Sequence, residues 1–164
     1  MNPLSESSGQ PHSDSPSESL ALLAYCGLYC GACSFRVAAE ENDRRHLRVL
    51  PAKYDYLKEQ ELQLCPGCRA DVDNDGCAIK NCARGKGFAH CGECGEYPCA
   101  AIRQFAGDGI PHHAEIIENI EALCRVGTTA WLAEQASRWR CSCGAQLSWY
   151  ARDCPMCGGR ITRG

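Results

Sequence analysis

Cysteine is the residue type through which this chain could do chemistry, because 15 of its 164 residues are cysteines. Ten of them fall between Cys26 and Cys99, mostly as closely spaced pairs. These ten are Cys26, Cys30, Cys33, Cys65, Cys68, Cys77, Cys82, Cys91, Cys94 and Cys99. So many reactive thiols are not needed to fill a core. We therefore expect them to converge on disulfides, an iron–sulfur cluster or zinc.

The start of the sequence disfavours disulfides. Residues 1–19 have neither the basic nor the apolar region of a secretory signal peptide, and their Ser and Pro content predicts a disordered tail. The apolar segment 20–24 is too short to span a membrane. We therefore expect a cytoplasmic protein with reduced thiols, in which paired cysteines more often bind metal.

Iron–sulfur chemistry is one interpretation of the first three cysteines. Cys26, Cys30 and Cys33 have the C-x3-C-x2-C spacing that holds three irons of a four-iron cluster in radical S-adenosylmethionine enzymes. Only the spacing matches, since Ala32 stands where those enzymes usually carry an aromatic residue and the chain is short for their barrel. An iron–sulfur or thiol redox protein built on these cysteines stays open as the alternative.

Zinc fits the remaining cysteine pairs better. Cys65 and Cys68, like Cys91 and Cys94, have the two-residue gap with which one tight turn directs two sulfurs at a single ion. Ten cysteines would fill two four-thiolate sites and leave two thiols over. The spacing does not say which cysteines share an ion.

The C-terminal cysteines form the most specific motif of the chain. Cys141 and Cys143 are followed, after ten residues, by Cys154 and Cys157, and the sequence predicts a β-strand at 146–150 between them. Two cysteine turns separated by a short hairpin predict a zinc ribbon with all four sulfurs on one ion, although the first pair has only a one-residue gap. Together with two sites in the front stretch, the chain would hold about three zinc ions.

Apolar periodicity, caps and breakers predict helices around the cysteine pairs. They are expected at residues 34–50, 54–64, 98–105, 112–126 and 130–138, with a connecting turn at 83–90. Cys124 falls on the apolar stripe of the fourth helix and is expected to be buried. These elements and the ribbon strand predict a small α+β fold stabilised by metal, because the chain has few large apolar residues for its length. The expected parts are a disordered tail (1–19), a cysteine-rich metal-binding module (20–107), a helical linker (108–138) and the zinc ribbon (139–164).

Other residues that can bind metal have plainer interpretations. Segment 71–76 begins like an EF-hand loop, but Cys82 stands where the bidentate glutamate is required, so we expect an acidic turn. His90 could bind zinc, yet the cysteines around it are better candidates. His112 and His113 are expected at the exposed start of a helix, because adjacent helical side chains do not face each other.

The charge and the aromatic content of the chain indicate which kind of partner it could bind. A formal net charge of −3 does not suggest that the whole chain binds nucleic acid, but its C-terminal part is basic and aromatic. The residues concerned are Arg138, Trp139, Arg140, Trp149, Tyr150 and Arg152. They could engage a protein partner or single-stranded nucleic acid, or the aromatic residues could simply pack around the ribbon. No catalytic constellation is visible, so a zinc-binding structural or binding module is favoured over an enzyme.

The order of the motifs resembles a family of small prokaryotic proteins catalogued as domain of unknown function 3795. The resemblance covers about residues 25–158 and rests on YCGLYCGAC, CPGC, CAIKNCARGKG and CGECGEYPC, followed by a helix and a ribbon. It implies a zinc-binding cytoplasmic protein in which the ten front cysteines occupy family positions. The first ribbon pair departs from the usual two-residue gap. The resemblance implies no reaction, because the family has no assigned chemistry.

Overall fold

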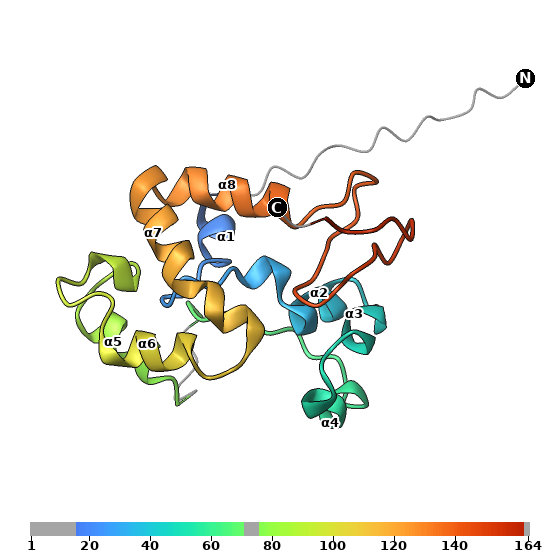
Figure 1. The fold of residues 1–164 in the computed structure, drawn as a ribbon, viewed down its shortest axis with the longest axis horizontal. Helices are drawn as coiled ribbons and strands as arrows, with labels where there is room; N and C mark the ends of the chain where they lie inside the picture. The colour runs from blue at the N-terminus through green and yellow to red at the C-terminus, as the bar shows by residue number, and fades with distance from the viewer. Residues whose placement is uncertain (1–15, 71–75, 163–164) are drawn as a thin grey trace, which may run out of the picture.

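The computed structural model describes residues 16–70 and 76–162 and is mostly helical in these ranges (Figure 1). The α-helices are α1 (Pro16–Leu20), α2 (Ser34–Glu40), α3 (Arg45–Arg48), α4 (Asp55–Lys58), α5 (Ala78–Gly85), α6 (Ala100–Ala106), α7 (Ile116–Val126) and α8 (Thr128–Arg138). The 3-10 turns are η1 (Cys30–Ala32), η2 (Ala52–Tyr54), η3 (Cys91–Glu93) and η4 (Pro111–Glu115). None of the described helices is long and apolar enough to cross a membrane.

The predicted α+β class is not confirmed, because the described residues contain isolated β-bridges in place of strands. The strand predicted at 146–150 is wrong. Each turn of the ribbon is held by a single bridge, Arg140 to Gln146 and Asp153 to Arg160. A ladder needs several paired residues in a row, whereas here the chain turns back at Gly144 and Gly158, both with positive φ.

Several helix boundaries differ from the prediction. The helix expected at 34–50 is broken into α2 and α3 at Asn42, which has a φ of 50°. The helix expected at 54–64 is reduced to η2 and α4, since Tyr56 and Leu64 are exposed and give it no face to bury. Helix α5 lies partly where a turn was expected. Residues 71–75 of the predicted acidic turn lie outside the described residues.

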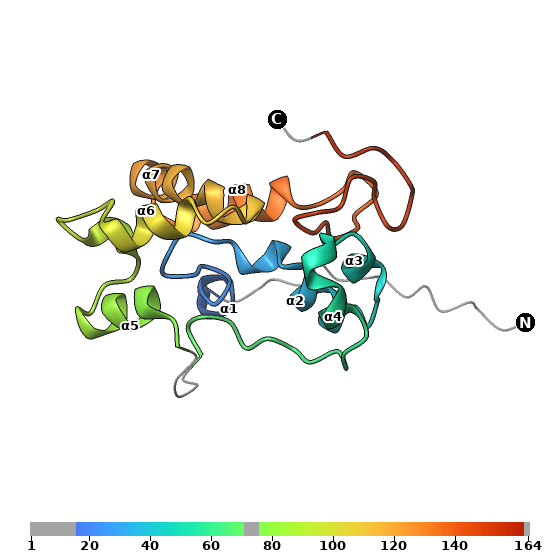
Figure 2. The same cartoon turned by 60° about the horizontal axis from the view of Figure 1, so that its bottom comes forward.

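The helices expected at 98–105, 112–126 and 130–138 are confirmed by α6, by η4 with α7, and by α8. Helices α7 and α8 follow one another around Gly127 and pack together, as Figures 1 and 2 show. Their buried faces meet the first loop of the cysteine-rich module and the C-terminal residues in one core cluster. Its buried members are Leu23, Tyr29, Ala32, Ile120, Leu123, Trp131, Leu132, Trp139, Leu147 and Cys154.

The C-terminal cysteine loops lie beside α2 and α3, at the right of Figure 1. The Trp149 backbone N–H donates to the carbonyl of Ala32 at 2.9 Å. The Gln146 side-chain amide donates to the carbonyl of Gly31 at 3.0 Å. Gly31 and Ala32 are the two residues between Cys30 and Cys33, so the ribbon directly holds one turn of the cysteine-rich module.

Candidate metal centres

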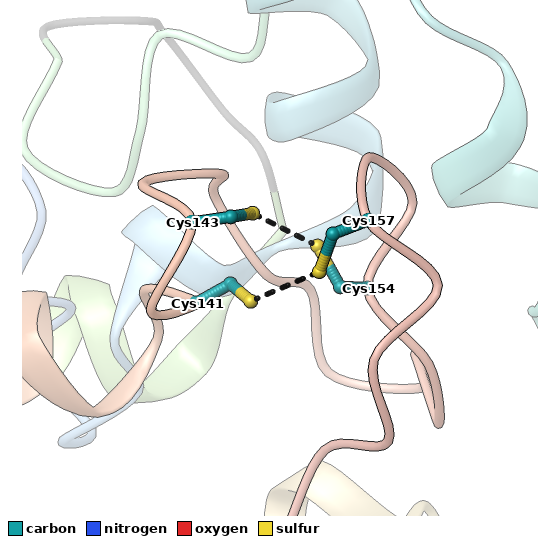
Figure 3. A group of neighbouring side chains, drawn as sticks. All are labelled: Cys141, Cys143, Cys154 and Cys157. Carbon is teal, nitrogen blue, oxygen red and sulfur yellow. Dashed lines mark hydrogen bonds between the residues drawn. The ribbon is translucent and has the colours of Figure 1, made fainter.

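The four C-terminal cysteines point their sulfurs at one another from two facing loops (Figure 3). The Sγ atoms of Cys141 and Cys157 are 3.7 Å apart, and those of Cys143 and Cys154 are 3.6 Å apart. All four lie within 4.8 Å of one another. Four sulfurs bound to zinc at about 2.3 Å in a tetrahedron would be about 3.8 Å apart. The donor set and its spacing therefore fit a tetrahedral metal ion.

Backbone turns give this site its shape. The Cys141 N–H donates to the carbonyl of Ala145 at 2.9 Å, and the Cys154 N–H donates to the carbonyl of Gly159 at 2.8 Å. The backbone N–H of Cys143 donates to the Cys141 sulfur, which with the neighbouring thiols lowers the pKa of Cys141 to about 6. The one-residue gap between Cys141 and Cys143 thus puts an amide where it stabilises a thiolate.

Four of the ten front cysteines line one small cavity of about 70 Å³. These are Cys82 on α5, Cys91 and Cys94 at the ends of η3, and Cys99 just before α6. Burial raises the pKa of Cys91 to about 11, and Cys99, Cys82 and Cys94 are near enough to add to the rise.

The other front cysteines also lie near one another, and Cys26 and Cys77 lie near Cys91 as well. A hydrogen bond to Cys68 and burial raise the pKa of Cys30, and burial raises that of Cys26 to about 12, with further contributions from Cys68 and Cys77. Burial also raises the pKa of Cys33, two backbone N–H groups oppose the rise, and Cys65 adds to it. The CxxC turn of Cys30 and Cys33 therefore lies near the CxxC turn of Cys65 and Cys68.

The sulfurs of Cys26, Cys30 and Cys33 do not come together as a group of three. Within residues 16–70 and 76–162, only two groups of three or more Cys, His, Asp or Glu side chains place their ligand atoms within 4.8 Å of one another. One is the ribbon. The other consists of Glu41, Asp43 and His46, which the sequence did not single out.

The Glu41, Asp43 and His46 group is held by hydrogen bonds. His46 is buried, with Nε2 3.0 Å from a Glu41 carboxylate oxygen and Nδ1 3.2 Å from Ser148 Oγ. The Arg45 guanidinium donates to the Asp43 carboxylate and lowers its pKa. We interpret this group as a structural link between α3 and the ribbon.

Two sequence predictions near the front cavity need correction or refinement. Cys124 is exposed, so the prediction of a buried thiol is wrong. The buried stripe of α7 runs through Ile116, Ile120 and Leu123, and Cys124, about 100° further round the helix, falls beside it. His90 is buried, burial lowers its pKa, and its Nδ1 atom has no hydrogen-bond partner.

The aromatic residues of the C-terminal part are largely engaged inside the molecule. Trp139 is buried, and the Trp149 ring stacks on His112 with centroids 3.9 Å apart and planes within 10°. The Tyr150 hydroxyl lies 2.8 Å from His112 Nδ1. His112 lies at the start of a helix as predicted, but the prediction that it is exposed is wrong, because Trp149 and Tyr150 partly cover it.

Comparison with protein families places about half of the chain in a known family. The model of a family described as "Protein of unknown function (DUF3795)" matches residues 22–104, about half of the chain. No curated protein and no solved structure matches. The matched residues contain all ten front cysteines, whereas α7, α8 and the ribbon lie outside them.

Proposed function

We propose a function for this chain from its own cysteine sites, on the premise that it belongs to the family of proteins of unknown function DUF3795. The proposed function is that of a zinc-binding scaffold, a structural and binding module without catalytic activity of its own. The observation that carries it is the gathering of four C-terminal sulfurs at the spacing of a tetrahedral site (Figure 3).

Zinc is the metal that suits this site best. Four thiolates form a closed ligand set, which leaves no open position for substrate or water. Cys154 is buried in the core cluster, so an ion at the ribbon would fix the ribbon to the rest of the fold. Both features are typical of structural zinc and argue against catalysis.

The ten front cysteines are proposed as further zinc ligands, for about three ions per chain in all. The proximity of many of them supports this proposal, because Cys26 and Cys30 lie near Cys68, and Cys82, Cys94 and Cys99 lie near Cys91. A closed thiolate set is also what iron–sulfur clusters use, so metal identity is decided by measurement and not by the ligand type.

The scaffold is proposed to act in the cytoplasm on a macromolecular partner, and a protein is favoured over nucleic acid. Trp139 is buried and Trp149 is half-buried with its ring stacked on His112, which reduces the stacking surface that single strands require. Arg138 and Arg140 are partly used within the chain, by Glu115 and by the Gly144 carbonyl.

The test is elemental analysis with an absorbance spectrum on the full chain purified without oxygen. We expect zinc, no visible absorbance band, and the loss of one zinc per chain in the double variant Cys154→Ser, Cys157→Ser. Cys124→Ser is the matched control, because it removes a thiol outside the ribbon and is expected to keep every zinc. Iron with a broad visible band would overturn the zinc proposal in favour of iron–sulfur chemistry. A ribbon variant that keeps every metal ion would overturn the ribbon site.

A further inference from the structure

We infer that Cys82, Cys91, Cys94 and Cys99 share one metal ion, a thiophilic divalent cation such as Zn²⁺, and that the Lys86 ammonium is part of this site. The inference rests on the proposed function, because it assumes that the front thiols bind metal. It adds which four of the ten share an ion and which neighbouring residue controls how tightly the ion is held.

Three separate elements bring the four thiols to one cavity. Helix α5 carries Cys82, the turn η3 begins at Cys91 and is followed by Cys94, and Cys99 directly precedes α6. The Cys94 N–H donates to the Cys91 carbonyl at 3.1 Å, which closes the turn between these two cysteines. All four residues line the cavity of about 70 Å³.

The rest of the cavity wall suits a metal ion held by the four sulfurs better than it suits another occupant. Apolar side chains, among them Ile79, Phe88 and Ile102, make up much of the lining. A cavity of this size has room for an ion but not for an organic cofactor. Among donors that reach such a space, four sulfurs select a thiophilic cation over magnesium or calcium.

The sulfurs are not as close together here as in the ribbon, where all four lie within 4.8 Å of one another. Metal binding must therefore draw them inward. Gly87, with a φ of 72°, and Gly95, which has no neighbouring atom in the path of a Cβ, lie in the connections on either side of the η3 turn. These connections can adjust at small cost because glycine is conformationally permissive.

Lys86 supplies the charge that such a site needs. A divalent ion with four thiolates carries a net charge of −2. The Lys86 Nζ atom is 3.9 Å from Cys94 Sγ and 3.6 Å from a Glu96 carboxylate oxygen. Lys86 also lines the cavity that the four cysteines share, so its ammonium lies beside the thiols. An N–H donor to a ligand sulfur stabilises the thiolate and holds its orientation.

The assignment is tested by native mass spectrometry of the full chain loaded with zinc, before and after single substitutions. Cys94→Ser is expected to lose one zinc relative to the wild type, while Cys124→Ser keeps the wild-type number. Wild type with zinc at the ribbon alone would overturn this inference and leave the ribbon proposal standing. Wild type without any zinc would overturn both.

A lysine variant keeps the test decisive if Cys94→Ser fails to fold. Lys86→Met keeps most of the length of the side chain and removes its charge. It is therefore expected to weaken the binding of one zinc ion by about tenfold in competition with a chelator, without changing the number of ions bound. Lys58→Met is the matched control, because Lys58 pairs with Asp55 on α4. Equal zinc affinities in Lys86→Met and Lys58→Met would overturn the role of Lys86.

Discussion

Gly27 is a single residue on which the packing of the cysteine-rich module against α7 depends. It is buried, its φ is 93°, and a Cβ at this position would lie 2.7 Å from Ile120 Cγ1 and 3.1 Å from the Ile116 carbonyl oxygen. The Asn119 side-chain amide donates to the Gly27 carbonyl at 3.0 Å. Both the backbone conformation and the lack of a side chain are therefore required.

Gly27→Ala is expected to destabilise the zinc-loaded protein by about 2–5 kcal/mol, as the sum of backbone strain and overpacking. Urea unfolding gives the measurement. Gly109→Ala separates the two causes, because Gly109 has a φ of 83° and nothing within 4 Å of its Cβ position. The control should lose only about 1–2 kcal/mol. Equal losses in the two variants would contradict the packing argument.

His112 is expected to make the stability of the fold sensitive to mild acid. Burial, with a contribution from His113, lowers the pKa of His112 to about 4, below the ordinary value of 6.5. The folded state thus favours the neutral ring. Its contribution to stability is complete above pH 6.5 and is lost as the pH falls toward 4, because the unfolded chain binds the proton first.

His112→Gln should flatten this part of the pH profile. Between pH 6.5 and 4 the free energy of unfolding of the wild type should fall more steeply than that of the variant, by at most about 1.4 kcal/mol per pH unit. Chemical denaturation at a series of pH values measures the difference, and metal loss in acid affects both proteins alike. Parallel profiles would show that His112 does not titrate as argued.

At the scale of elements, the long amphipathic helices were predictable and the short ones were not. Ile116, Ile120 and Leu123 repeat at helical spacing, and the structure buries all three. Between residues 34 and 64 the apolar pattern is weak, so local features such as Asn42 and the Asp43 side chain, which accepts the Arg45 N–H at 2.9 Å, decide where helices break.

Trp131 anchors helix α8 in the core. It is fully buried, and its ring meets Tyr29 edge to face with centroids 6.1 Å apart. Trp131→Ala is expected to cost about 3–5 kcal/mol in urea unfolding. Trp131→Phe should cost clearly less, because it keeps a ring and removes an indole N–H that has no hydrogen-bond partner. The check is the order of the two unfolding free energies. A Trp131→Phe variant less stable than Trp131→Ala would contradict the packing argument.

For the whole molecule, the spacing of cysteines predicted that the four C-terminal thiols come together but not the arrangement around them. A C-x-C pair and a C-x2-C pair separated by a short loop can meet locally, so this grouping was predictable from sequence. The proposed grouping of the front thiols depends on how residues of α5, η3 and α6 come to line one cavity, which spacing does not encode. The docking of the ribbon on Gly31 and Ala32 is likewise a long-range packing result.

Metal removal should loosen the whole molecule and not the ribbon alone. Cys154 belongs to the same core cluster as Trp131 and Ala32. Loss of an ion bound at the ribbon would therefore loosen the packing of the common core. Structural zinc contributes roughly 10–16 kcal/mol of apparent free energy in small zinc domains. Thermal melts before and after complete chelation are expected to show a large drop in the midpoint. An unchanged melt would show that burial alone holds the fold.

The hydrogen bonds from Gln146 and Trp149 to the turn between Cys30 and Cys33 have a consequence for biosynthesis. A ribosome adds about 5–20 residues per second, so residues 22–104 emerge several seconds before the ribbon that holds this turn. During that interval the nascent chain displays the front thiols without their C-terminal support. Newly made protein is therefore expected to pass through a stage in which its first cysteines are open to metal capture or oxidation, until Gln146 and Trp149 have been added.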